Sequence, residues 1–399
     1  MRGEDLGRKI EALPDEMKLF LLCSIKDIPV EQEEKIRDIL GAGISWDDFL
    51  IIVERHRVYM TVYRQLTRIH SENVNSRALN ELHRISQRKV MQSVRLASEL
   101  VNVARLLEDS DISVISLKGP LLSINIYGDI AYRSSKDLDI LISEHDIDKA
   151  DKLLLANGFR RIDADACFSP KQKAYLIRTR QHFVYQNKDR VIIEMHWRVS
   201  SGNTVFHFDE LWKNRKGSEL SGQTINVLSD EDEFLYLLFH GSAHGYSRLR
   251  WLCDIAEIIK KDKLPWGRIL KRVTEMNIME MLVQTVILVE NLLHIEIPEA
   301  LRASLVTSRT GQKMALQAIS IMTETDESSM QGGSFFNNRI WKYNMLRSKG
   351  LRSKLEFFVN RFRPALIDLN TIHFSDRFFF MYYLVRPFLK VYRSIIRRS

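Results

Sequence analysis

The feature that most restricts the fold of this chain is a change in the spacing of its apolar residues near position 110. Before it, apolar residues such as Leu79, Leu82 and Ile85 recur every three or four positions, which predicts helices. After it come short β-rich runs, ISVISL and DLDILI among them, and helical spacing resumes after residue 228. We therefore expect an α+β protein, with a small mixed β-sheet core flanked by N- and C-terminal helical regions.

The length of 399 residues exceeds the usual size of a single domain. We expect four segments: a helical N-terminal region (1–110), a core (111–228), a helical domain (229–330) and a basic, aromatic C-terminal segment (331–399). The 3 cysteines are far apart and form no CxxC pair, which predicts neither a disulfide framework nor a zinc knuckle. This cysteine usage and the short apolar runs favour a reducing, cytoplasmic location without a membrane span.

Three acidic residues lie within strand-like runs, where an unpaired charge is costly to bury. Side chains alternate along a strand, so Asp137 and Asp139 are predicted to share one face. The same rule places Glu194, His196 and Arg198 on one face of the run VIIEMHWRV. Carboxylates that converge repel each other unless a cation neutralises them, and Mg²⁺ prefers carboxylate and phosphate oxygens. The pattern favours a metal and nucleotide site, and solvated or salt-bridged acids are the alternative.

A turn between a predicted strand and helix lies just before these acids. Lys118 and Gly119 end the strand, and Pro120 stands at a plausible first helical position. Backbone N–H groups at such a helix start can bind phosphate. Arg133 and Ser134 lie directly upstream of the acids and could reach the same phosphates.

The order of these motifs resembles the poorly characterised bacterial nucleotidyltransferase family of capsule, antibiotic and peptide biosynthesis clusters, within the DNA polymerase β-like superfamily. The resemblance is carried by Lys118-Gly119, Tyr127-Gly128, Arg133-Ser134, Asp137-Leu138-Asp139, Glu194-Met195-His196-Trp197 and HGSAHGYSRLRWLCDIAEII, residues 240–259. It implies a nucleotidyltransferase core and the transfer of a nucleoside monophosphate from an NTP to an unknown acceptor, such as a biosynthetic intermediate, a lipid-linked sugar or a peptide.

The resemblance also implies roles for single residues. Asp137, Asp139 and Glu194 would hold Mg²⁺ or Mn²⁺, and the Lys118-Gly119 turn would contact phosphate. The superfamily commonly has Gly-Ser at this turn, whereas Pro120 offers neither an N–H group nor a hydroxyl, which weakens the expected triphosphate grip.

Further polar residues are candidates for the acceptor side of the site or for its catalysis. His196 could act as a general base or could orient Glu194 through a hydrogen bond. His240 and His244 have the i, i+4 spacing of zinc ligands, but no HExxH motif surrounds them, and a polar helix face over the cleft is favoured. Asp254 is expected to form an i, i+4 salt bridge with Arg250 or to line the acceptor pocket with Arg198.

The charge of the chain is concentrated in its C-terminal segment. Residues 339–399 contain 14 Lys or Arg and 3 Asp or Glu, against a net charge of +8 for the whole chain. Basic and aromatic residues together can bind an anionic membrane surface or nucleic acid, of which the membrane is favoured. The alternative is that the aromatic side chains pack on the core.

Other functions remain open at this point. A toxin-like nucleotidyltransferase that modifies tRNA or protein would carry the same RSxxDxD pattern. A non-catalytic nucleotide-binding relative would keep the fold without the reaction, as Pro120 hints. A glycosyltransferase with a DxD motif is a weaker alternative, because no long N-terminal nucleotide-binding α/β unit is predicted.

Overall fold

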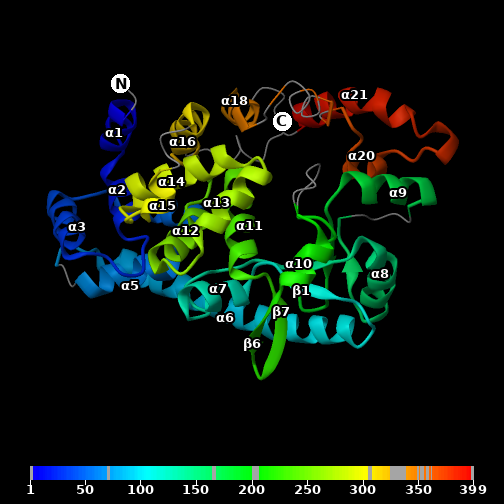
Figure 1. Cartoon of the computed structure of the whole chain (residues 1–399), viewed down its shortest axis with the longest axis horizontal. Coiled ribbons are helices and arrows are strands. Elements are labelled where there is room, and N and C mark those ends of the chain that lie inside the picture. The colour runs from blue at the N-terminus through cyan, green and yellow to red at the C-terminus, as the bar shows by residue number, and fades with distance from the viewer. Residues whose placement is uncertain are drawn as a thin grey trace. The chain divides into compact units, whose positions relative to one another are not determined.

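The structure is a computed structural model of the whole chain (Figure 1). It describes residues 3–69, 72–163, 168–199, 206–303, 308–323, 338–347, 350, 355, 359–360 and 362–396. Cys167 lies outside these residues, as does the expected boundary at 330. Within the described residues, no helix combines the length and the apolarity needed to span a bilayer.

The chain divides into two compact units, and each is described by itself. The helical unit contains residues 1–101, 117–136 and 216–323, and the sheet unit contains residues 102–116, 137–215 and 324–399. The elements of the helical unit are α1 (Gly3–Glu11), α2 (Asp15–Leu22), α3 (Val30–Ala42), α4 (Trp46–His56), α5 (Tyr59–Ile69), most of α6 (Ser76–Glu108), α7 (Pro120–Tyr127), β6 (Lys216–Leu220), β7 (Gln223–Val227), α11 (Asp230–Ala243), α12 (Arg250–Lys261), α13 (Trp266–Glu275), α14 (Met279–Leu293), α15 (Glu299–Arg302) and α16 (Arg309–Met322).

The core of the helical unit lies between α11, α12, α14 and α16, which pack against one another (Figure 1). Leu237, Leu252, Ile255 and Leu282 are buried there. Ser229 caps α11 by accepting a hydrogen bond from the backbone N–H of Asp232. The hairpin β6–β7 is antiparallel and pairs residues 216–220 with residues 223–227.

The sheet unit contains the short strands and the C-terminal helices. Its elements are β1 (Val114–Ser116), β2 (Leu138–Ile142), η1 (Glu144–Asp146), α8 (Ile147–Ala156), β3 (Arg160–Arg161), α9 (Pro170–Thr179), β4 (His182–Gln186), β5 (Ile192–His196), α10 (Phe208–Asn214), α18 (Asn338–Arg347), α20 (Leu366–Thr371), η3 (Asp376–Phe378) and α21 (Met381–Ile396).

The strands of this unit lie in the order β3-β4-β5-β2-β1. β5 runs parallel to β2 and antiparallel to β4, so the sheet is mixed. Ile140, Phe183, Ile193 and Met195 have no exposed surface, because alternate side chains of the central strands enter the core. The five residues 187–191 join β4 and β5 in a hairpin, and Arg190 among them lies in the left-handed region, at φ 60.

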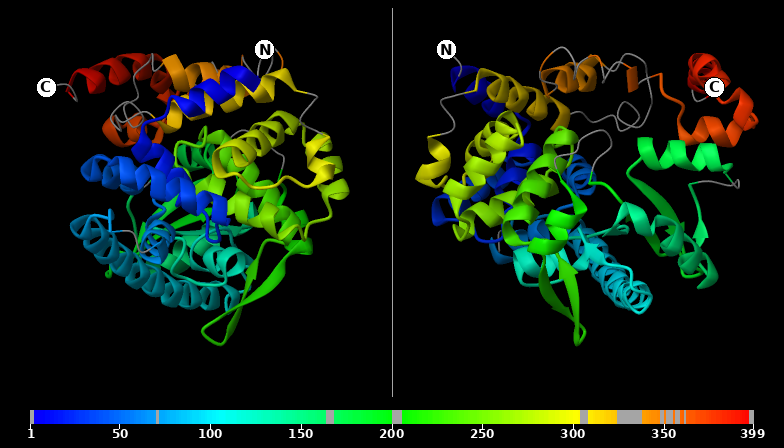
Figure 2. Two further views of the ribbon diagram at one scale, coloured as in Figure 1. Left: turned by 90° about the vertical axis from the view of Figure 1, so that its left-hand side faces the viewer. Right: turned by 45° about the vertical axis from the view of Figure 1, so that its right-hand side comes forward.

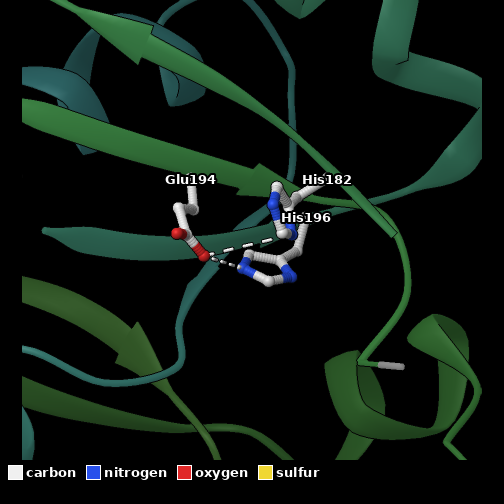
Figure 3. A group of neighbouring side chains, drawn as sticks. All are labelled: His182, Glu194 and His196. Atoms are coloured by element: carbon white, nitrogen blue, oxygen red, sulfur yellow. Dashed lines mark hydrogen bonds and ion pairs between the residues drawn. The ribbon is translucent and has the colours of Figure 1, made fainter. Parts of the chain in front are cut away.

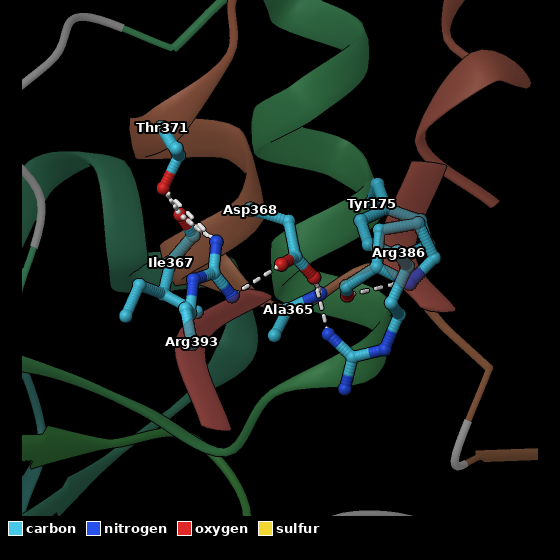
Figure 4. Close-up of polar contacts among 8 residues, drawn as sticks. Tyr175, Ala365, Ile367, Asp368, Thr371, Arg386 and Arg393 are labelled. Carbon is cyan, nitrogen blue, oxygen red and sulfur yellow. Dashed lines mark hydrogen bonds and ion pairs between the residues drawn. The ribbon is translucent and has the colours of Figure 1, made fainter. Parts of the chain in front are cut away.

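Helices α20 and α21 lie beside α9 in the sheet unit (Figure 2). The hydroxyl of Tyr175 on α9 donates to the carbonyl of Pro364, over 3.0 Å. Asp368 is buried and accepts hydrogen bonds from Arg386 and, at 2.7 Å, from Arg393 (Figure 4). Two of the basic side chains of the C-terminal segment therefore hold that segment together.

The predicted α+β class is confirmed, with a small mixed sheet and extensive helical regions before and after it. The expected core segment 111–228 contributes to both compact units: β1 to β5 belong to the sheet unit, and α7 and the β6–β7 hairpin belong to the helical unit. The four segment boundaries remain a prediction.

Candidate active site

Acidic side chains of β2 and β5 meet on one face of the sheet. Asp139 and Glu194 are direct partners in the parallel register of the two strands. The Nε2 atom of His196 lies 3.2 Å from Oδ1 of Asp139 and 3.3 Å from Oε2 of Glu194. One imidazole can contact both carboxylates only if all three side chains point to the same side. The structure thus places Glu194 on the face of Asp139, as strand alternation predicts.

Asp137 lies in the bend that leads into β2 and is half-buried. It precedes Asp139 by two positions, and Lys136 before it is exposed. The sequence predicts that its carboxylate joins that of Asp139, and this part of the acidic face remains a prediction.

His182 is a member of this group that sequence reasoning missed. It is the first residue of β4 and pairs with His196 of β5, so that the two ring centroids lie 4.7 Å apart. Its Nδ1 atom lies 3.9 Å from Oε2 of Glu194 (Figure 3). The alternation of HFVYQ, with Phe183 and Tyr185 in the core, would have placed His182 on the acidic face.

Burial and charge set the protonation of this group. Burial, followed by the neighbouring His196, lowers the pKa of His182 to about 4, so its ring is neutral at pH 7. For Glu194, burial acts to raise the pKa, but the hydrogen bond with His196 and the nearby His182 oppose it, and the net shift is downward. Glu194 is therefore a carboxylate at neutral pH.

The predicted phosphate turn lies in the helical unit. Gly119 has φ 95, a conformation that favours glycine, and it precedes the first turn of α7. Pro120 occupies the first position of α7, as predicted. The Nζ atom of Lys118 lies 5.9 Å from the ring centroid of Tyr236 on α11. The turn has the predicted strand-to-helix form, and its contact with phosphate remains a prediction.

Arg133 has partners other than the expected phosphates. Its Nε donates to Oδ2 of Asp254 over 2.8 Å, and its Nη1 donates to Ser135 over 3.2 Å. The hydroxyl of Tyr127 donates to the other carboxylate oxygen of Asp254 over 3.0 Å. The side chains of Arg133 and Asp254 are 3% and 0% exposed, which gives the pair a structural role.

The expected salt bridge between Arg250 and Asp254 is wrong, because each has another partner. Nη1 of Arg250 donates to the carbonyl of Ser134 over 2.9 Å. Ser134 itself is buried. An arginine anchored at Ser134 therefore lies two residues from Lys136 along the chain.

Positive side chains gather around this anchor in the helical unit. Nδ1 of His56 accepts a hydrogen bond from the backbone N–H of Leu249 over 3.0 Å, which brings Arg57 beside Arg248 and Arg250. Burial, followed by Arg133 and Arg57, lowers the pKa of Arg250 to about 9. Partial burial of its side chain, followed by Arg57 and Arg248, also lowers the pKa of Lys136. The neighbouring cations add to the effect of burial, and a cluster of positive charges attracts anions.

The remaining candidates are two histidines at the C-terminal end of α11 and Arg198. The rings of His240 and His244 lie 4.8 Å apart and pack on Trp251, at 5.3 and 5.1 Å. Arg198 pairs with Glu144 over 2.7 Å. Among the described residues, the one group of three or more potential metal ligands is His182, Glu194 and His196, so the two helix histidines are not part of such a group.

The acidic face fits a divalent cation. Its donor set combines carboxylate oxygens with imidazole nitrogens, and the ligand atoms of His182, Glu194 and His196 lie within 4.8 Å of one another. Nδ1 of His182 is buried and has no hydrogen-bond partner among the described residues. Two carboxylates and a buried, unsatisfied nitrogen on one face are an arrangement that a cation stabilises.

Comparisons with known proteins identify the family of the chain. No curated protein matches the chain. A solved structure described as an antigenic nucleotidyltransferase-like protein from Paracoccidioides brasiliensis is 15% identical, covers 51% of this chain and 93% of its own, and has a TM-score of 0.28, which is too low to support a structural conclusion. The family model described as "Uncharacterised nucleotidyltransferase" matches residues 42–294, a range that includes Asp137, Asp139 and Glu194. The chain therefore belongs to this family of uncharacterised nucleotidyltransferases.

Proposed function

We propose that this protein transfers a nucleoside monophosphate from an NTP to an acceptor, with a divalent cation held by Asp137, Asp139 and Glu194. The observation that carries the proposal is the convergence of Asp139 and Glu194 on one imidazole, within 3.2 and 3.3 Å. Membership of the family supports a transferase acting on a nucleotide. The acceptor is a hydroxyl or phosphate group of a biosynthetic intermediate, a lipid-linked sugar or a peptide.

In the proposed reaction an acceptor oxygen forms a bond to the α-phosphorus as the bond to pyrophosphate breaks. A divalent cation, when bound, would neutralise the charge that develops on the attacking and leaving oxygens. His196 contacts both carboxylates, and this fixes their direction toward one point. Mg²⁺ or Mn²⁺ suits the two carboxylates.

For the phosphates of the substrate we propose the turn at Lys118 and Gly119 together with Lys136 and the arginines near it. Arg250 is anchored at Ser134, and Lys136 directly precedes Asp137 in the chain. We leave Arg133 out of this proposal because it forms a buried pair with Asp254. The cations near Lys136 offset the donor that Pro120 lacks.

The proposal is tested by incubating the protein with each of the four NTPs, labelled at the α-phosphate, and with Mg²⁺ or Mn²⁺. Pyrophosphate release and labelling of an acceptor fraction from cell extract are measured. Asp139→Asn and Glu194→Gln are expected to lower the rate at least 100-fold, because each removes a charge from the cation site. Asp148→Asn is the control, since the side chain of Asp148 is 67% exposed in the same unit.

Each outcome selects one function. Equal rates for the wild type and both acidic-face variants would refute the proposal. Label recovered in tRNA or protein would identify a toxin-like nucleotidyltransferase. Metal-dependent NTP binding without any transfer would identify a non-catalytic relative.

We also propose that the C-terminal segment contacts an anionic membrane surface that carries the acceptor. Three exposed residues of α21 follow one another at intervals of four and so form a row along the helix: Leu384, Phe388 and Tyr392. Phe380, directly before α21, and Arg377 are exposed as well. A row of apolar side chains beside cations suits the headgroup region of a bilayer.

Flotation with vesicles that contain anionic or only neutral lipids tests this contact. The wild type is expected to float with anionic vesicles, and the double variant Leu384→Ser/Phe388→Ser is expected to remain in the bottom fraction of the gradient. Equal flotation of the variant, or retention of the wild type by RNA in place of vesicles, would refute it.

A further inference from the structure

The acidic face contains two imidazoles in addition to its carboxylates. His182 and His196 come from neighbouring antiparallel strands and are direct register partners. With Glu194 they present three potential ligand atoms that lie within 4.8 Å of one another (Figure 3). Oδ1 of Asp139 lies beside this group, 3.2 Å from Nε2 of His196. The ligand atoms of His182, Glu194 and His196 therefore occupy a volume that a single ion can span.

The surroundings of His182 argue against a purely structural ring. Its Nδ1 atom is buried and has no hydrogen-bond partner among the described residues. Leaving a buried polar nitrogen unsatisfied costs free energy of folding. Oε2 of Glu194 is 3.9 Å away from this atom, beyond hydrogen-bonding distance. An ion between the two side chains would satisfy both.

The ligand types decide which ion is favoured. Mg²⁺ is a hard ion that binds oxygen and keeps several water molecules, and it gains little from imidazole. Imidazole nitrogen with carboxylate oxygen suits the divalent transition metals. Two imidazoles beside two carboxylates therefore favour a divalent transition metal over Mg²⁺, and Mn²⁺ is the transition metal that also suits carboxylate oxygens.

We propose that His182 and His196 are ligands of the cation on this face, beside Glu194 and Asp139, and that the site selects Mn²⁺ over Mg²⁺. The inference deepens the proposed function by naming the ion and its nitrogen ligands, and it rests on that function only in needing a cation at the same face. It assigns His182 a role that no sequence motif indicates.

The test is pulsed electron paramagnetic resonance of Mn²⁺ bound to the full-length protein. The wild type is expected to show ¹⁴N modulation from imidazole coordination, and His182→Gln is expected to reduce it and to weaken Mn²⁺ binding about tenfold. Binding of Mg²⁺, measured by its competition with Mn²⁺, is expected to change less than twofold in the same variant. His145→Gln is the control, because His145 is exposed in the same unit.

The absence of ¹⁴N modulation in the wild type would overturn the inference. This measurement on the wild type does not depend on whether a variant folds. An equal loss of Mn²⁺ and Mg²⁺ affinity in His182→Gln would also overturn it. The proposed transfer activity fails separately: Mn²⁺ bound with ¹⁴N coupling but without nucleotide transfer refutes the reaction alone. Transfer without ¹⁴N coupling refutes the nitrogen ligands alone.

Discussion

Replacing Asp254 with asparagine removes the counter-charge of Arg133 and keeps the shape of the side chain. Both carboxylate oxygens of Asp254 accept hydrogen bonds, from Tyr127 at 3.0 Å and from Arg133 at 2.8 Å. The substitution leaves a guanidinium that is 3% exposed without its carboxylate. Breaking a buried ion pair at one partner costs about 3–5 kcal/mol of unfolding free energy. We expect Asp254→Asn to lower the stability by that amount.

The structure offers a matched control in the same unit. Asp129 pairs with Arg64 over 3.2 Å, and their side chains are 38% and 44% exposed. Asp129→Asn is expected to cost less than about 1 kcal/mol, because solvent screens an exposed pair. The contrast between the two asparagine variants isolates the effect of burial.

Urea denaturation at pH 7, followed by far-UV circular dichroism, measures both costs. The double variant Arg133→Gln with Asp254→Asn completes a double-mutant cycle and is expected to be less destabilised than the sum of its single variants. A cost for Asp254→Asn equal to that of Asp129→Asn would refute the structural role of the pair. It would return Arg133 to the candidates for phosphate binding.

Three further predictions concern stability. Burial in the folded state lowers the pKa of His56 from 6.5 to about 3, so the stability that the neutral ring contributes is full above pH 6.5 and is lost as the pH falls toward 3. The expected loss is about 2 kcal/mol of unfolding free energy at pH 5. Urea denaturation between pH 7 and 5 measures this loss, and a pH-independent stability contradicts it. Burial raises the pKa of Glu233 from 4.5 to about 7, so the contribution of its protonated form to stability is full below pH 4.5 and is lost as the pH rises through 7. Glu233→Gln should therefore raise the unfolding free energy by about 3 kcal/mol at pH 8 and leave it unchanged at pH 4. The same gain at both pH values would be inconsistent with burial as the cause. Asp368→Asn should weaken the contacts of this residue with Arg386 and Arg393. The rate of amide hydrogen exchange in residues 365–396 should then rise at least tenfold, while residues 138–142 keep their protection. An unchanged exchange rate would show that the two contacts of Asp368 are dispensable.

Local patterns predicted much of the candidate site. Strand alternation placed Glu194 and His196 on one face, and the structure confirms this because His196 contacts both Glu194 and Asp139. The start of α7 at Pro120 and the cap of α11 at Ser229 follow from local backbone preferences, which the surrounding fold does not override.

Contacts between distant residues could not be predicted in this way. Arg133 and Asp254 are 121 positions apart, so no local spacing indicates their pair, whereas the i, i+4 spacing of Arg250 and Asp254 suggested a pair that does not form. The division of residues 111–228 between two compact units depends on long-range packing as well. His182 is an intermediate case. The pattern of β4 indicates which face of the strand His182 lies on, but only the pairing of β4 with β5 shows that Glu194 and His196 lie on the same face.

The central claim is that the carboxylates of Asp139 and Glu194 form one cation site for a nucleotide. Isothermal titration calorimetry with a non-hydrolysable NTP analogue, in the presence of Mn²⁺ or of a chelator, tests it most directly. The wild type is predicted to bind the analogue only with the metal, and Asp139→Asn and Glu194→Gln are predicted to lose that metal dependence. Equal binding by the wild type and both variants, or binding by the wild type that the chelator leaves unchanged, would contradict the claim.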